Sequence, residues 1–139
     1  MDEPTSLMIG QTAEFTKTFS PADVYAFAAA SGDRNPVHLE ASYAEQTVFG
    51  GRIVHGLLVA GLISAVLGTT LPGHGTIYLG QDLKFKAPVY IGETVTARVE
   101  VVKLRSDKRI ATLSTNCYNQ DGKLVIDGEA VVLYPESAH

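Results

Sequence analysis

The stretch IVHGLLVAGLISAVLG, residues 53–68, decides the fold. Drawn as a helix, it is apolar around its whole circumference, and it contains no Asp, Glu, Lys or Arg. A helix of this kind either crosses a membrane or lies buried inside a protein. At the usual rise it would be roughly 24 Å long, short of the ~20 residues that a bilayer requires. We therefore predict a buried core helix and no membrane contact.

The segments around this helix are typical of β-strands. Residues 75–90, 93–106, 108–120 and 122–134 are long, rich in β-branched residues and separated by turn signals such as SDK and QDG. A short strand is also expected near the start, at residues 13–20. To cover the helix, an antiparallel sheet of these strands must curl around it. The expected fold is therefore α+β, a hot-dog fold formed as a single domain by residues 1–139.

A single curled sheet has two open edges and cannot enclose the helix completely. Long strands with free edges favour pairing with a second copy of the chain. We therefore expect a homodimer.

Composition excludes several classes of protein. The chain has 139 residues and a formal net charge of −4, and no face is obviously basic, which argues against nucleic-acid binding. Cys117 is the single cysteine, so no internal disulfide is possible and a reducing compartment is favoured. The start MDEPTS, residues 1–6, lacks the basic and apolar regions of a secretory signal. A cytoplasmic location is the expectation.

The stretch SGDRNPVHL, residues 31–39, gathers an acid, an Asn-Pro turn and a histidine. It follows a predicted amphipathic helix, residues 20–32, whose Ser N-cap and early Pro are typical of a helix start. Pro36 fixes its own backbone and restrains Asn35. The turn either brings Asp33 and His38 to one water molecule or is an ordinary polar turn, in which Asp33 is a cap and His38 is solvated. Spacing alone leaves both interpretations open.

The motif SGDRNPVHL followed by GGRIVHGLLVAGLIS resembles the MaoC-like (R)-specific enoyl-CoA hydratases. The similarity continues through LGQDLKFKAPVYIGETVTARVEV and covers about residues 10–134. Within the family, the chain is most similar to short, single-domain hydratases that supply (R)-3-hydroxyacyl-CoA for polyhydroxyalkanoate synthesis. One departure is Ala30, where the family commonly has a larger aliphatic residue, which affects only packing at a helix end.

The resemblance implies a reversible syn hydration of trans-2-enoyl-CoA. This reaction must move a proton from water, protonate C2 and stabilise an enolate-like thioester oxygen, and it requires no metal or organic cofactor. The resemblance implies Asp33 and His38 as the proton-handling dyad, Gly56 as the oxyanion donor at the helix start, and Asn35 as part of the substrate site. Ser64 is implied to orient Asp33, although a serine bonded to its own helix backbone is an alternative.

Other residues are weaker candidates. Leu67 is expected on the Gly56 side of the helix, where it would limit the acyl tail. Lys84 and Lys86 alternate with Phe85 and could hold coenzyme A phosphates or be ordinary solvated surface, as could the basic turn at residues 103–109. His55 is interpreted as a structural, hydrogen-bonding histidine. No spacing of His, Cys and Asp suggests a metal site, and Cys117 is expected to be a small core residue.

Three other functions are alternatives to an enoyl-CoA hydratase. A dehydratase acting on 3-hydroxyacyl-acyl carrier protein or on a branched acyl-CoA would use the same fold and dyad. A hot-dog thioesterase is disfavoured, because such enzymes carry their acid on the buried helix and this helix has none. A non-catalytic acyl-CoA-binding subunit would have lost the dyad. The sequence leaves the acyl-chain length and the metabolic pathway open.

Overall fold

The computed structural model describes residues 7–136, so the acidic start at residues 1–6 lies outside the described residues. The described part has an α+β layout. In chain order its elements are β1 (Thr12–Thr18), α1 (Pro21–Ser31), α2 (Pro36–Leu39), α3 (Ala41–Glu45), α4 (Gly56–Thr69), β2 (Ile77–Phe85), β3 (Thr94–Arg105), β4 (Ile110–Asn119) and β5 (Leu124–Leu133).

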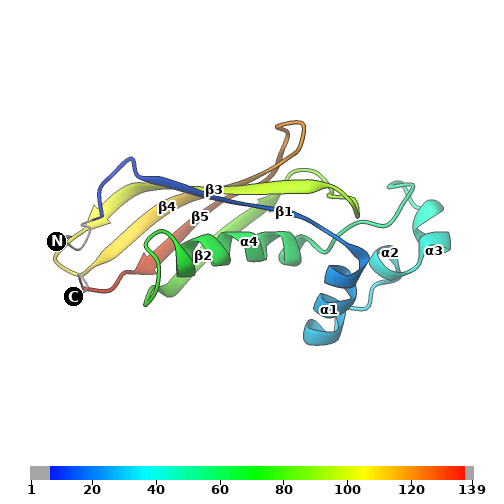
Figure 1. Cartoon of the computed structure of the whole chain (residues 1–139), viewed down its shortest axis with the longest axis horizontal. Helices are drawn as coiled ribbons and strands as arrows, with labels where there is room; N and C mark the ends of the chain where they lie inside the picture. The colour runs from blue at the N-terminus through cyan, green and yellow to red at the C-terminus, as the bar shows by residue number, and fades with distance from the viewer. Residues whose placement is uncertain (1–6, 137–139) are drawn as a thin grey trace.

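The strands form one antiparallel sheet in the order β1-β3-β4-β5-β2. It curls over α4, which runs along one of its faces (Figure 1). Buried side chains alternate with half-buried ones along β4, in the period of two that a sheet covered on one face requires. The predicted hot-dog arrangement is confirmed, and β1 and β2 are its open edges.

Helix α4 supplies the centre of the core. Five of its side chains are buried against the sheet: Val59, Leu62, Ile63, Val66 and Leu67. They pack with buried residues of the central strands, such as Val99 and Leu113. Among residues 7–136, no helix has both the length and the apolar character needed to cross a membrane.

The face of α4 that points away from the sheet is not buried. Leu57 is 62% exposed, and Gly61 and Ser64 are exposed too, because a single sheet covers only one side of a helix. The helix also begins later than the apolar run does. Ile53 forms a β-bridge with Tyr90, and the amide of Val54 donates to the carbonyl of Val89, so these residues are extended.

The three remaining helices lie together at the end of the sheet where α4 begins (Figure 1). Helix α1 starts as predicted, since Ser20 and Asp23 exchange the two hydrogen bonds of a capping box. It ends at Gly32, which has a φ of 83° and so occupies the left-handed region that favours glycine. This sharp end turns the chain into the Asp33–His38 segment. The basic turn between β3 and β4 lies at the opposite end of the sheet.

Candidate active site

Residues 31–39 form a chain of local hydrogen bonds. The amide of Asp33 donates to Ser31 Oγ at 3.1 Å, and Asp33 Oδ1 accepts from the amide of Asn35 at 3.2 Å. Asn35 Oδ1 then accepts from the amide of Val37, which makes Asn35 the N-cap of α2. Asp33 is therefore not a helix cap, although its Oδ1 does hold the turn that precedes α2. Only Oδ1 of the Asp33 carboxylate accepts a hydrogen bond in this turn. The residue is exposed, so the carboxylate also faces the solvent, beside His38.

His38 is buried, so the alternative interpretation of a solvated histidine is wrong. Its Nδ1 lies 2.8 Å from the carbonyl oxygen of Ile53. A carbonyl only accepts hydrogen bonds, so Nδ1 carries the hydrogen, and in the neutral ring the lone pair is on Nε2. The tautomer is thus the one that leaves Nε2 free to act as a base.

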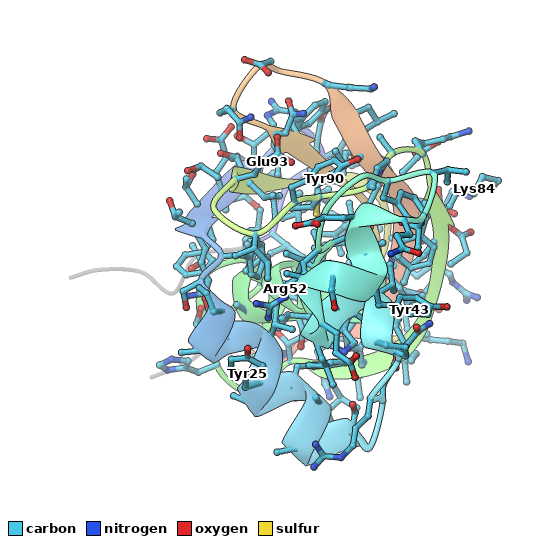
Figure 2. All side chains as sticks on the ribbon, turned by 90° about the vertical axis from the view of Figure 1, so that its right-hand side faces the viewer. Tyr25, Tyr43, Arg52, Lys84, Tyr90 and Glu93 are labelled. Atoms are coloured by element: carbon cyan, nitrogen blue, oxygen red, sulfur yellow. The ribbon has the colours of Figure 1, made fainter. Side chains whose placement is uncertain are left out.

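The main chain of His38 is held as well. Arg52 Nε donates to the carbonyl oxygen of His38 at 2.8 Å. The guanidinium of Arg52 also lies over the ring of Tyr25 on α1, with 5.2 Å between the guanidinium carbon and the ring centroid (Figure 2). These contacts connect α2 to α1 and to the segment before α4, and they limit movement of the histidine.

Burial lowers the pKa of His38 below its ordinary value of 6.5. The hydrogen bond to Ile53 raises the pKa, a charge on His55 would lower it, and the charge of Asp33 raises it. The net direction is downward, so His38 is neutral near pH 7 and available to accept a proton.

His55 also belongs to this cluster. It is 2% exposed and is the N-cap of α4, and its Nε2 lies 3.0 Å from the carbonyl oxygen of Asp33. Its ring is stacked on His38, with 3.9 Å between centroids and 27° between planes. The structural hydrogen bond predicted for His55 is present. Its contact with Asp33 and His38 was not predicted, because it depends on how the N-cap of α4 packs against residues 33–38, which sequence spacing does not reveal.

Asp33, His38 and His55 each offer an atom that could bind a metal ion, and these atoms lie within 4.8 Å of one another. The geometry does not fit a chelate. Imidazole lone pairs lie in the ring plane, and a bound Zn²⁺ would need nitrogen atoms at about 2.1 Å. The two ring centroids are 3.9 Å apart and the planes are inclined by only 27°, so the planes meet well outside both rings, too far for one ion to bind in both. We therefore interpret the cluster as stacked rings beside a carboxylate.

The start of α4 supplies the hydrogen-bond donors. The amides of Leu58 and Val59 donate to the carbonyl of His55, whereas those of Gly56 and Leu57 have no acceptor among residues 7–136. Free amides at a helix start carry a positive partial charge and attract a carbonyl oxygen that is gaining negative charge. A Cβ at Gly56 would lie 2.7 Å from the ring of Phe85, so only glycine lets that ring approach.

These groups line one cavity of about 510 Å³. Asp33, His38 and Gly56 form its polar side. Its apolar walls include Phe49, Val59, Phe85, Val89 and Ile126. The structure therefore brings together the acid, the base and the helix start beside an apolar chamber that fits an acyl chain.

The other predicted residues lie elsewhere. Ser64 lines a separate groove of about 410 Å³ between α4 and β2, together with Tyr78 and Gln81, and does not line the Asp33 cavity. Leu67 is 2% exposed and belongs to the core, beyond the residues that line the cavity. Asn35 holds the turn and is not part of the cavity wall.

Lys84 and Lys86 lie in different surroundings. Lys84 is exposed on β2, whereas Lys86 lines the cavity, next to Phe85. Phe85 is 54% exposed and lines the cavity, so the two lysines do not flank a buried side chain, and Lys86 lies beyond the end of β2. The basic turn lies far from this cavity, at the other end of the sheet (Figure 1). Arg105 and Arg109 pair there with Asp107 and Glu136.

A family model described as "MaoC like domain" matches residues 5–119. The chain belongs to the MaoC-like family. This match confirms the predicted resemblance, and the curved sheet with its central helix is the fold of the MaoC-like hydratases of known structure.

Individual relatives cover almost the whole chain. An (R)-specific enoyl-CoA hydratase from Aeromonas caviae is 55% identical over 130 residues, which is 94% of this chain and 97% of the relative. A protein of the same name from Rhodospirillum rubrum is 56% identical over 126 residues, 91% of this chain and 87% of the relative. The solved structure of an (R)-hydratase from A. caviae, described as involved in PHA biosynthesis, has a TM-score of 0.92 at 55% identity and covers 94% of this chain and 98% of that one.

Proposed function

We propose that this protein is an (R)-specific enoyl-CoA hydratase that reversibly converts trans-2-enoyl-CoA into (R)-3-hydroxyacyl-CoA. The observation that carries the proposal is the single cavity in which His38, the carboxylate of Asp33 and the start of α4 face an apolar chamber. Relatives with 55% and 56% identity carry the name of this activity, which supports the same substrate class and product configuration.

The proposed mechanism uses one water molecule held between Asp33 and His38. Asp33 accepts one hydrogen bond from the water and orients it. His38 Nε2 removes a proton as the water oxygen bonds to C3, and the electron pair of the double bond moves to the thioester oxygen. The amide of Gly56 stabilises this enolate. His38 then returns its proton to C2 from the same face, which gives syn addition and regenerates the neutral histidine.

Coenzyme A and the acyl chain occupy opposite sides of the thioester in this proposal. Lys86, which lines the cavity, interacts with the phosphates of coenzyme A in this proposal, and Lys84, within β2, is the weaker candidate. The acyl chain enters the apolar walls at Val59 and Ile126. No metal or organic cofactor takes part. Activity should therefore survive dialysis against EDTA.

We also propose that the working protein is a homodimer. Around the groove between α4 and β2, three large apolar side chains are exposed: Leu57 at 62%, Tyr78 at 42% and Leu79 at 53%. Strand β2 has a free edge beside them. A second copy would bury this surface and pair the edge. Ser64 lies on the same surface, so a role near a catalytic acid would require the partner.

We propose a cytoplasmic location from the single cysteine, Cys117. Burial raises the pKa of Cys117 to about 12, and this thiol is unreactive.

The deciding experiment mixes the purified protein with crotonyl-CoA and follows the ultraviolet absorbance of the enoyl thioester. Rapid loss of absorbance, with chiral analysis showing the (R)-alcohol, is the expected result. The reverse reaction from (R)-3-hydroxybutyryl-CoA should restore the absorbance. Saturable binding of crotonyl-CoA without turnover would instead identify an acyl-CoA-binding subunit.

A further inference from the structure

We propose that His55 is a positioning residue, which fixes the catalytic acid relative to the catalytic base through its hydrogen bond to the main chain of Asp33. The proposal rests on the dyad assigned above and adds a third residue to it. The geometry that supports it is the 3.0 Å contact from His55 Nε2 to the carbonyl oxygen of Asp33, formed by a side chain that is 2% exposed.

The direction of this hydrogen bond is fixed by its acceptor. The carbonyl of Asp33 has only lone pairs to offer, so His55 Nε2 carries the hydrogen. His55 Nδ1 is buried and has no hydrogen-bond partner among residues 7–136. Protonating Nδ1 would place an unpaired charge in that site and against the ring of His38. His55 therefore acts as a neutral donor, which is a different role from that of the base.

The ring of His55 is held in place from both sides. His38 is stacked on one side at 3.9 Å, and Phe27 of α1 lies at 4.7 Å with 57° between the planes. Its backbone is the N-cap of α4. One residue thus connects the acid and the base, which share residues 31–39, to the start of the oxyanion helix, which comes from a separate segment of the chain.

The local turn alone does not fix this geometry. Asp33 is exposed and follows Gly32, and its hydrogen bonds to Ser31 and Asn35 are internal to its own segment. Such bonds set the shape of the turn up to His38, but neither of them anchors Asp33 to a residue outside this segment. The His55 bond joins Asp33 to a residue 22 positions away and supplies that constraint. Misplacing a catalytic group by about 1 Å costs on the order of 10²-fold in rate.

Two substitutions separate the hydrogen bond from the packing of the ring. His55→Gln keeps a donor near the position of Nε2 and loses the ring, whereas His55→Phe keeps an aromatic ring and loses the donor. We expect His55→Phe to lower kcat by about 10- to 100-fold with KM changed by less than about threefold, because the substrate contacts remain. His55→Gln should recover most of the lost kcat. If the ring of His55 only filled space, His55→Phe would instead have the higher kcat of the two variants.

Two control variants separate the possible outcomes. Phe27→Leu replaces the other ring contact by an aliphatic one that still packs on His55 and touches no polar group, so its kcat should stay within about threefold of wild type. His38→Ala tests the dyad itself: if it retains activity, the proposed mechanism is wrong, independently of His55. Wild-type kcat in His55→Phe, or equal losses in His55→Phe and His55→Gln, would overturn the positioning role.

A measurement on the unmodified protein remains decisive if a variant does not fold. In ¹⁵N-labelled protein near pH 7, long-range ¹H–¹⁵N correlation should show His55 as the Nε2–H tautomer with an unprotonated Nδ1. A His55 ring protonated on Nδ1 alone would exclude the bond to Asp33 and with it the proposal.

Discussion

Nδ1 of His38 lies 2.8 Å from the carbonyl oxygen of Ile53, and this contact fixes which ring nitrogen can act as a base. Because burial lowers the pKa of His38, the acid limb of the kcat/KM profile should lie below pH 6.5, with little change in activity around neutral pH. Steady-state kinetics on crotonyl-CoA at a series of pH values measures this limb. A limb above 6.5 would mean that a different group is titrating.

The lowered pKa of His38 also makes the stability of the protein depend on pH. The unfolded chain binds a proton on His38 at its ordinary pKa, before the native protein does, so the free energy of unfolding should fall as the pH decreases below 6.5. Urea unfolding at about pH 7.5 and about pH 5.5 measures the loss. In His38→Gln, which has no titrating ring there, the dependence on pH should be weaker. An equal dependence in both proteins would assign it to other groups.

The catalytic acid can be tested without breaking its turn. Asp33→Asn keeps an oxygen that can accept from the amide of Asn35, so the fold and the melting temperature should change little. Turnover should fall by about 10²- to 10⁴-fold, and the double variant with His38→Ala should lose little more than either single one. If the fold-loss of turnover in the double variant equalled the product of the two single losses, the two residues would not act on one water molecule.

Gly56→Ala tests the helix start. The new Cβ would lie 2.7 Å from the ring of Phe85, which is 54% exposed and free to move aside. We expect stability to change by no more than about 1 kcal/mol, because alanine also favours the helix. The displaced ring and the added methyl should still lower kcat/KM by at least about tenfold. The double variant Gly56→Ala with Phe85→Leu separates the effect of the displaced ring from that of the added methyl. Only the part of the loss in kcat/KM that is due to the ring should recover in it.

Leu67→Ala tests whether the acyl chain extends into the core. Leu67 is buried beyond the cavity, so its truncation should cost ~2–5 kcal/mol of unfolding free energy. The cavity that it leaves should raise kcat/KM for eight-carbon relative to four-carbon enoyl-CoA. The measurement is the ratio of the two values in variant and wild type. An unchanged ratio in a folded variant would mean that the chain leaves the helix before Leu67.

Gly61→Glu tests the proposed dimer surface. Gly61 is exposed, and a Cβ there meets nothing within 4 Å in the single chain, so the substitution should not disturb the fold of one protomer. A buried negative charge would prevent a second copy from packing on α4. Sedimentation should show dimers for wild type and for the control Ala29→Glu, on the exposed side of α1, and monomers for Gly61→Glu. A monomeric, active wild type would contradict the proposal.

The sequence by itself determined the elements that depend on neighbouring residues. Apolar side chains all round residues 53–68 predicted a core helix, and the long β-branched runs after Pro72, separated by turn signals, predicted a sheet to cover it. The Ser20 N-cap and the early Pro21 of α1 depend only on neighbouring residues, and both are present as expected. The motif from Asp33 to His38 indicated the site because Asn35 and Pro36 constrain the backbone within a few bonds.

Only the tertiary structure decided which distant groups meet. His55 touches Asp33 and His38 because an extended segment pairs with Tyr90 and places the N-cap against α2, a contact that no spacing reveals. Ser64 and Leu67 are three positions apart on one helix, yet one is exposed and the other buried, since the sheet covers only one side. Exposure depends on which element lies opposite, and that is set by long-range packing.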